Sequence, residues 1–171
     1  SINHGGTDPI VSDLDLRLGQ HPANLLTNPD FDVNTTGWTV LSGSWGVNAT
    51  NYLVGGGSLE CSVAGSNREI YQQQTIPAGH ELGTAHLQFA RRNYASDALK
   101  VVLEARTSGG AVVVSAETGD TLANDGTYHI ENLYLDLDDP TIASLRVRVI
   151  SVTNGIGTNS MVVDAMRLHV H

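Results

Sequence analysis

The chain has 171 residues, 40% of them hydrophobic, which is enough for one domain with an apolar core. Nine Lys and Arg residues stand against eighteen Asp and Glu residues, which gives a net charge of −9 at pH 7. This excess of acid argues against nucleic acid and anionic membranes as partners, because phosphate binding needs clustered basic side chains, and no run of about 18 apolar residues predicts a transmembrane helix.

Residues 1–23 differ from the rest of the chain, and we expect them to form an extended N-terminal arm. Breakers such as Gly5–Gly6 prevent a regular element at the start, and Leu14, Leu16 and Leu18 then alternate with charged residues. This alternation is typical of a short strand whose apolar side needs a neighbour. We therefore predict that the arm does not fold alone and docks on a partner; the alternative is a disordered leader.

The next segment, residues 24–38, reads NLLTNPDFDVNTTGW. Pro29 and the lack of a 3.6-residue period exclude a helix. We predict a short edge strand that turns Phe31 inward and leads to Trp38, a second core residue.

The remainder of the chain consists of short apolar–polar alternations separated by turn residues. Ser42–Gly43 and Gly109–Gly110 each predict a hairpin. The single cysteine, Cys61, is expected to be a buried apolar residue. The predicted strands are 38–41, 44–47, 58–63, 68–76, 84–91, 99–106, 111–116, 128–137, 144–152 and 161–169. Their regular spacing, with no convincing helix, predicts an all-β sandwich or barrel.

Three segments resemble the carbohydrate-binding-module-like jelly rolls. Residues 24–32 resemble their first strand, residues 70–79 their Q-x-[VI]-x-[VI]-P-A-G strand and turn, and residues 162–168 their closing strand. The order and spacing cover residues 24–170 and imply one domain, a jelly-roll β-sandwich of two antiparallel sheets, over residues 24–171. The sequence departs from the pattern at Ala165, where a second acidic residue is usual.

The same resemblance implies a structural calcium ion beside the first and last strands. Its carboxylate ligands would be Asp32, after the phenylalanine of the first strand, and Asp164, the first acid of the closing strand. Calcium takes several oxygen ligands, including carboxylates and backbone carbonyls. The alternative is that both are turn residues that accept backbone hydrogen bonds, and Ala165 weakens the metal interpretation.

The segment from His4 to Leu18 resembles a short N-terminal motif of bacteriophage virion proteins. In that motif H-x-x-G-G-[ST]-D-x-[IL] precedes L-x-x-[RL]-L, whereas here His4 adjoins the glycines directly. The resemblance implies that the arm docks on a virus particle. Its docking residues would be His4, Asp8, Ile10, Leu14, Leu16 and Leu18.

Sugar recognition needs exposed aromatic rings beside polar groups, and aromatic residues make up only 5% of the chain. We assign both phenylalanines and Trp38 to the core. Trp45, Tyr52 and Tyr94 are then the candidates for a glycan platform, with Trp45 the ring expected to be most open to solvent. Each of the three could instead be a packing residue, so we expect weak glycan binding or none.

The sequence shows no H-E-x-x-H, G-x-S-x-G or phosphate-loop motif, and we predict a protein without enzymatic activity. His169 and His171 share one side of the last strand and could bind a metal, although terminal histidines are more often solvent-exposed. Apart from calcium we expect no cofactor.

Arm and sandwich together predict a bacteriophage virion structural protein, with a capsid decoration (cement) or head-fibre protein as the first choice. It would be made in the host cytoplasm and carried on the outer surface of the virion, where an acidic surface is suitable. Its partners would be the major capsid protein or tail components, and analogy with phage fibres indicates a homo-oligomer, a trimer. The alternative is a carbohydrate-binding module or a tail appendage protein that recognises host surface glycans; a hydrolase of the same fold ranks last.

Overall fold

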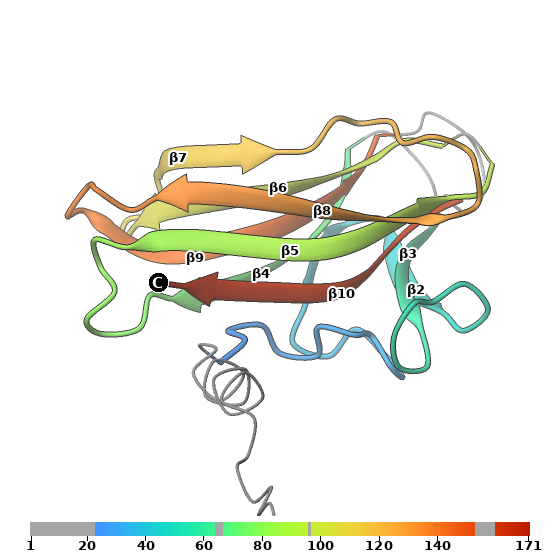
Figure 1. The fold of residues 1–171 in the computed structure, drawn as a ribbon, viewed down its shortest axis with the longest axis horizontal. Helices are drawn as coiled ribbons and strands as arrows, with labels where there is room; N and C mark the ends of the chain where they lie inside the picture. Colours follow the sequence, from blue (N-terminus) through green and yellow to red (C-terminus); the bar gives the residue numbers. More distant parts are fainter. Residues whose placement is uncertain (1–22, 64–66, 96, 153–159) are drawn as a thin grey trace, which may run out of the picture.

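The computed structural model describes residues 23–63, 67–95, 97–152 and 160–171. Within these ranges the chain forms ten strands in two five-stranded sheets that face each other (Figure 1). The predicted all-β jelly-roll sandwich of two antiparallel sheets is confirmed. None of the described ranges holds a helix that is long and apolar enough to span a membrane. The predicted docking residues of the arm lie outside the described residues.

The two sheets are called A and B here, and all their pairings are antiparallel. Sheet A has the order β1 (Thr39–Ser42), β4 (Arg68–Thr75), β9 (Ile142–Ser151), β6 (Leu99–Thr107), β7 (Val112–Glu117). Sheet B has the order β2 (Ser44–Asn48), β3 (Ser58–Val63), β10 (Met161–Val170), β5 (Thr84–Asn93), β8 (Tyr128–Asp136). Each of the ten strands predicted from residue 38 onward occurs, with ends shifted by at most two residues.

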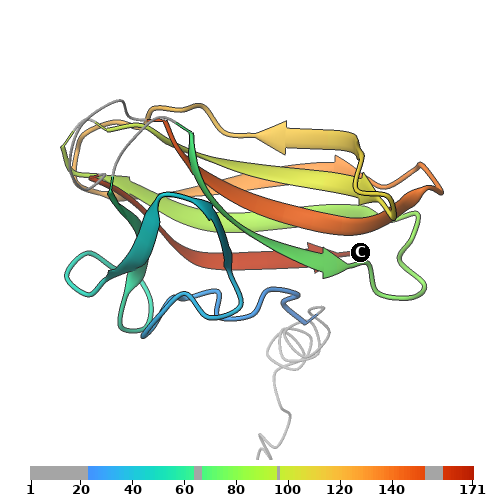
Figure 2. The ribbon, with the colours of Figure 1, turned by 180° about the vertical axis from the view of Figure 1, so that it is seen from behind.

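The predicted hairpin at Ser42–Gly43 is wrong. β1 pairs with β4 and β2 pairs with β3, so the chain passes from sheet A to sheet B at Gly43 (Figure 2). Gly43 has a φ of 85°, and a Cβ atom there would lie 2.9 Å from the Cβ of Arg68. A short turn sequence cannot distinguish a hairpin from a crossing, because the pairing partners are distant in sequence. The second predicted hairpin is confirmed by the pairing of β6 with β7.

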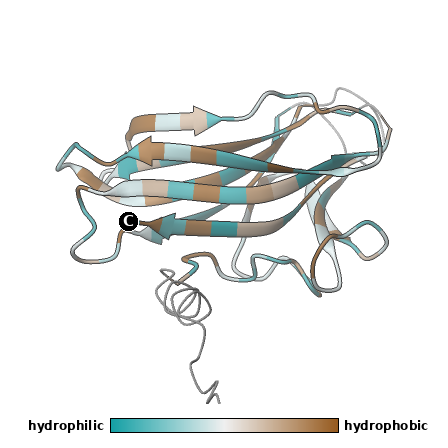
Figure 3. Ribbon diagram, in the orientation of Figure 1, coloured by the Kyte–Doolittle hydropathy of each residue, from teal (hydrophilic) through white to brown (hydrophobic). Residues whose placement is uncertain are grey.

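Apolar side chains fill the space between the sheets, and hydropathy alternates along the strands (Figure 3). Trp38 and Cys61 are buried, as predicted. Each fully buried large apolar side chain contributes about 1.5–3 kcal/mol relative to exposure. The largest fully buried apolar residues are Phe31, Leu59, Ile70, Leu87, Phe89, Leu99, Leu103, Leu137, Leu145, Met161 and Met166.

A charged side chain also lies between the sheets. Arg91 of β5 is 2% exposed, and its Nε and Nη2 donate to the Glu131 carboxylate of β8 at 2.5 and 2.8 Å. Its Nη1 donates to the carbonyl oxygens of Leu99 and Gly119, at 2.5 and 2.9 Å. Because a buried guanidinium is tolerated only when its N–H groups are paired, these bonds tie β5 and β8 to the start of β6 in the opposite sheet.

Residues 23–38, here called the bridging segment, form no strand, contrary to the prediction. The Leu25 amide donates to the carbonyl of Leu168 in β10 at 2.9 Å. Thr27 exchanges two hydrogen bonds with the side chain of Gln72 in β4, at 2.7 and 3.0 Å. The bridging segment therefore contacts both sheets and lies along the lower edge of the sandwich in Figure 1.

Backbone conformation explains why this segment is not a strand. Asn28 and Phe31 have positive φ angles of 50° and 49°, which interrupt an extended ladder. The Phe31 side chain is nevertheless fully buried, as predicted, and its ring centroid lies 5.2 Å from that of Trp38.

Candidate functional site

The predicted platform residue Trp45 lies in the core, so its assignment as an exposed ring is wrong. It is 8% exposed, pairs in register with buried Cys61, and its Nε1 donates to the Ser42 carbonyl at 3.0 Å. The small residues Ser44 and Gly46 on either side suggested a loop, but they belong to β2.

The other two platform candidates lie nearer the surface. Tyr52 is 44% exposed in the 49–57 loop. Tyr94 is half-buried, its hydroxyl accepts a hydrogen bond from Asn48 Nδ2 at 3.4 Å, and burial raises its pKa. With Trp45 inside the sandwich, the three rings do not form one surface.

The predicted calcium ligands meet at one loop. Asp32 Oδ1 accepts a hydrogen bond from the Gly56 amide at 3.0 Å. Asp164 Oδ2 accepts from the amides of residues 53–54, at 2.7 and 2.9 Å, and its Oδ1 accepts from the Ala165 amide at 2.7 Å. The two carboxylates, 132 positions apart in the sequence, thus hold the same loop through its backbone N–H groups.

A glycine makes the closest of these approaches possible. Gly55 has a φ of 69°, and a Cβ atom there would lie 1.7 Å from Asp32 Oδ1. Any other residue at this position would displace the carboxylate.

The donors around Asp164 do not fit a calcium ion. Three N–H groups occupy three of the roughly four lone-pair positions of its carboxylate. Burial raises the pKa of Asp164, backbone hydrogen bonds oppose this shift, and the nearby charge of Asp30 adds to it. No group of three or more His, Cys, Asp or Glu suited to a metal occurs in the described ranges. Calcium stays a prediction, which melting curves with calcium and with a chelator would test.

Sequence analysis did not identify the ion pairs on the outer face of sheet A. Arg148 of β9 donates to both oxygens of Glu69 in β4 at 2.7 Å, and to Glu104 Oε1 in β6 at 2.6 Å. Arg106 Nε donates to the second oxygen of Glu104 at 2.8 Å. We call Glu69, Arg148, Glu104 and Arg106 the ion-pair row.

The carboxylates of this row are almost fully covered, with Glu104 only 4% exposed. Burial alone would raise the pKa of Glu104, but the hydrogen bonds from Arg106 and Arg148 outweigh burial and lower it. The carboxylate is therefore held ionised, in one orientation, at neutral pH.

An aromatic ring lies beside the row. The guanidinium of Arg146 stacks over Tyr71, 4.2 Å from the ring centroid. Its Nε and Nη2 both donate to Gln73 Oε1, at 2.9 and 2.6 Å, and Gln73 Nε2 donates to the Ser144 hydroxyl at 2.9 Å. Strand alternation could have assigned these residues to one face, but their neighbours across β4 and β9 depend on a register that the sequence does not reveal.

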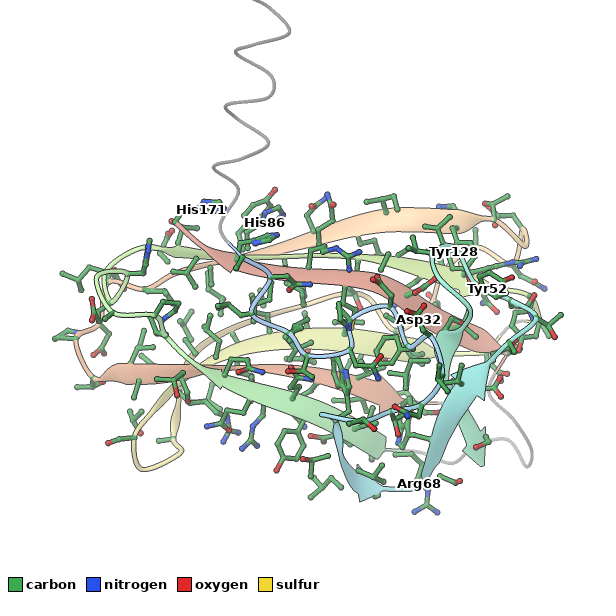
Figure 4. All side chains as sticks on the ribbon, turned by 90° about the horizontal axis from the view of Figure 1, so that it is seen from below. Asp32, Tyr52, Arg68, His86, Tyr128 and His171 are labelled. Carbon is green, nitrogen blue, oxygen red and sulfur yellow. The ribbon has the colours of Figure 1, made fainter. Side chains whose placement is uncertain are left out.

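The outer face of sheet B is different. His169 and His171 lie on one side of the chain end, as predicted, with ring centroids 6.3 Å apart. Together with His86, Gln88 and Arg167 they line a cavity of about 230 Å³. Figure 4 shows His86 and His171 close together at one end of this face, with Tyr128 and Tyr52 at the other end.

No protein-family model and no curated protein matches the chain. The fold is similar to a domain of the tailspike protein 4 of bacteriophage CBA120, with a TM-score of 0.66 and 15% identity over 86% of this chain and 21% of the tailspike chain. It is also similar to a family 16 carbohydrate-binding module, with a TM-score of 0.65 and 11% identity over 85% of this chain and 99% of the module.

A third similar structure is a family 61 carbohydrate-binding module in complex with β-1,4-galactotriose, with a TM-score of 0.59 and 18% identity over 87% of this chain and 99% of the module. The chain thus spans about a fifth of the tailspike but nearly the whole of the two modules. These similarities show that the fold is the carbohydrate-binding-module jelly roll.

Proposed function

We propose that this domain binds carbohydrate through the outer face of sheet A, around Tyr71. One observation carries the proposal: a row of planar polar side chains, fixed by mutual hydrogen bonds, adjoins an aromatic ring on a sheet face. This reverses the order of our sequence-based hypotheses, in which a virion structural role came first.

The geometry suits sugar hydroxyls. A guanidinium has five N–H groups, and the bonds of Arg148 to Glu69 and Glu104 engage three of them. Because the side chains are already held in place, little rotamer entropy is lost when a ligand binds. The Tyr71–Arg146 stack supplies a flat surface for a pyranose ring beside the remaining N–H donors of Arg148.

The similar structures support a carbohydrate ligand. Two of them are carbohydrate-binding modules that match this chain over nearly their whole length, and one of these holds β-1,4-galactotriose.

An array of plant and bacterial polysaccharides that includes β-1,4-galactan, followed by calorimetric titration, tests the proposal. Tyr71→Ala should weaken binding about tenfold, because it removes the stacked surface. Tyr52→Ala, which removes an exposed tyrosine of the 49–57 loop, is the matched control and should leave affinity unchanged. Binding that survives Tyr71→Ala but not Tyr52→Ala would contradict the placement, and an array with no hit would contradict the function.

The similarity to a phage tailspike and the virion-type motif in residues 4–18 favour a second candidate, a component of a bacteriophage particle. In this role the arm docks the domain on the outer surface of the virion, as a decoration protein, head fibre or tail appendage. A carbohydrate-binding face would then recognise the host surface. A homotrimer is part of this proposal, by analogy only.

Replacing Leu14, Leu16 and Leu18 together with Asp tests the docking role of the arm. The variant should keep the melting temperature of the wild-type chain but be missing from purified particles, because the apolar side of the arm is lost. Normal incorporation of the variant would contradict the docking role. The trimer would be contradicted if light scattering showed a monomer in solution and the protein did not assemble on the particle either.

A further inference from the structure

The cavity on the outer face of sheet B has an unusual lining for so acidic a protein. His86 and Gln88 of β5 and Arg167, His169 and His171 at the end of the chain line it, and every one of these side chains carries N–H groups. None of the five is a carboxylate, although the chain has a net charge of −9.

An aromatic stack adjoins the cavity. The rings of His86 and Tyr134 lie 4.4 Å apart at an interplanar angle of 7°, and Tyr134 is 59% exposed. His86 Nε2 lies 2.9 Å from Asn132 Oδ1, which also accepts a hydrogen bond from Gln88 Nε2 at 3.2 Å. Since an amide oxygen accepts, the contact places a proton on Nε2 and fixes the orientation of the imidazole.

The guanidinium of Arg167 is paired with Asp30 but keeps N–H groups for a ligand of the cavity. Arg167 Nη1 donates to Asp30 Oδ1 at 2.7 Å and to the Met166 carbonyl at 2.8 Å, so both bonds use the same nitrogen.

We propose that this cavity is a second binding site, for an acidic sugar. The carboxylate of the sugar accepts hydrogen bonds from the guanidinium of Arg167, and its ring lies against the His86–Tyr134 stack. A volume of about 230 Å³ is below that of most ligand sites, which suits one monosaccharide unit. This site is on the opposite sheet from Tyr71 and has a different lining, so it does not depend on the function proposed above.

NMR titration of the ¹⁵N-labelled full chain with glucuronic acid tests the site, with glucose as the uncharged counterpart and acetate as the bare anion. Glucuronic acid should shift the amide signals of Gln88 and Arg167 in a saturable way, with an affinity at least fivefold higher than that of either comparison ligand. Equal affinity for acetate would mean an adventitious anion only, and equal affinity for glucose would mean a neutral-sugar site. Either result, or no saturable shift with glucuronic acid, would overturn the proposal.

Two variants locate the binding. Arg167→Ala and His86→Ala should each weaken glucuronic acid binding about fivefold to tenfold, while the remaining amide spectrum shows that the sandwich stays folded. Arg68→Ala removes an exposed arginine from the opposite side of the molecule and should leave affinity unchanged (Figure 4). Loss of affinity in Arg68→Ala equal to that in Arg167→Ala would indicate a general charge effect and overturn the site.

Discussion

Each sheet carries a buried carboxylate on its outer face, but the two carboxylates have different hydrogen-bond partners. Glu104 of sheet A is bonded by two guanidinium groups, whereas Asp164 of sheet B is bonded by three backbone amides beneath the 49–57 loop. Burial raises the pKa in both environments, and only the arginines outweigh it, so the pKa of Glu104 falls while that of Asp164 rises. At these two sites, charged donors offset the effect of burial on the acid, whereas neutral amides next to the negative charge of Asp30 do not.

The largest expected effect is that of Arg148→Ala, which removes the centre of the ion-pair row. It leaves Glu69 and Glu104 nearly buried without their shared partner and should lower the free energy of unfolding by about 3 kcal/mol at pH 7. Arg167→Ala on sheet B removes an ion pair with Asp30 whose side chains are 34% and 25% exposed, and it should cost less than about 1 kcal/mol. Urea denaturation of both variants measures the two losses of unfolding free energy. Equal losses would contradict the predicted difference between the sheets.

Glu104→Gln should cost about 2 kcal/mol at pH 7, because two charge-assisted hydrogen bonds become neutral ones. The folded pKa of Glu104 lies below its ordinary value of 4.5, so its contribution is present above that pH and is lost as pH falls through the lowered pKa. The stability difference between wild type and variant should therefore shrink below about pH 4.5. A stability difference that stays constant from pH 7 to pH 3 would contradict the lowered pKa of Glu104 in the ion-pair row.

Asp164→Asn should cost only about 1 kcal/mol, because the amide side chain retains one acceptor oxygen for the 53–54 amides. Its dependence on pH should be opposite to that of Glu104→Gln. The folded pKa of Asp164 is raised above 3.8, so the folded state binds this proton more tightly than the unfolded state does. Its contribution is greatest below the unfolded pKa and is lost as pH rises through the raised one.

Chemical denaturation between pH 3 and pH 7 measures this second dependence. The advantage of wild type over Asp164→Asn should increase as pH falls, whereas its advantage over Glu104→Gln decreases. If the stability difference from wild type changed with pH in the same direction for both variants, the contrast between the two sheets would be refuted.

The smallest expected effect is that of Tyr134→Ala on the outer face of sheet B. The ring is largely exposed and stacks only on His86 among the aromatic residues of the described ranges, so stability should change by no more than about 0.5 kcal/mol. Thermal unfolding measures it, and a loss above about 1 kcal/mol would show that this face supports the fold as the ion-pair row does.

Much of the fold could be predicted from the sequence, because alternation of apolar and polar residues is a local signal. All ten strands and the burial of Phe31 and Trp38 follow from it. Trp45 was placed wrongly because its serine and glycine neighbours resemble a loop, although they face away from the core.

The sites depend on contacts that are distant in the sequence. The resemblance to jelly rolls brought Asp32 and Asp164 to one place, but it did not indicate that amides bind them. The bond from Arg148 to Glu69 joins residues 79 positions apart, and the register of β4 against β9 decides it. No pattern within one strand contains that information.

The single glycine between β1 and β2 also limits how the two sheets can separate. Gly43 alone joins edge strand β1 of sheet A to edge strand β2 of sheet B. Because this connection is so short, the two sheets cannot separate at this edge while both strands stay paired. Under a stretching force one strand has to peel away first, and β1, with three residues paired to β4 against five between β2 and β3, has the weaker hold. The domain is therefore expected to yield from its N-terminal side, with β1 detaching before the bonds of β2 come under load.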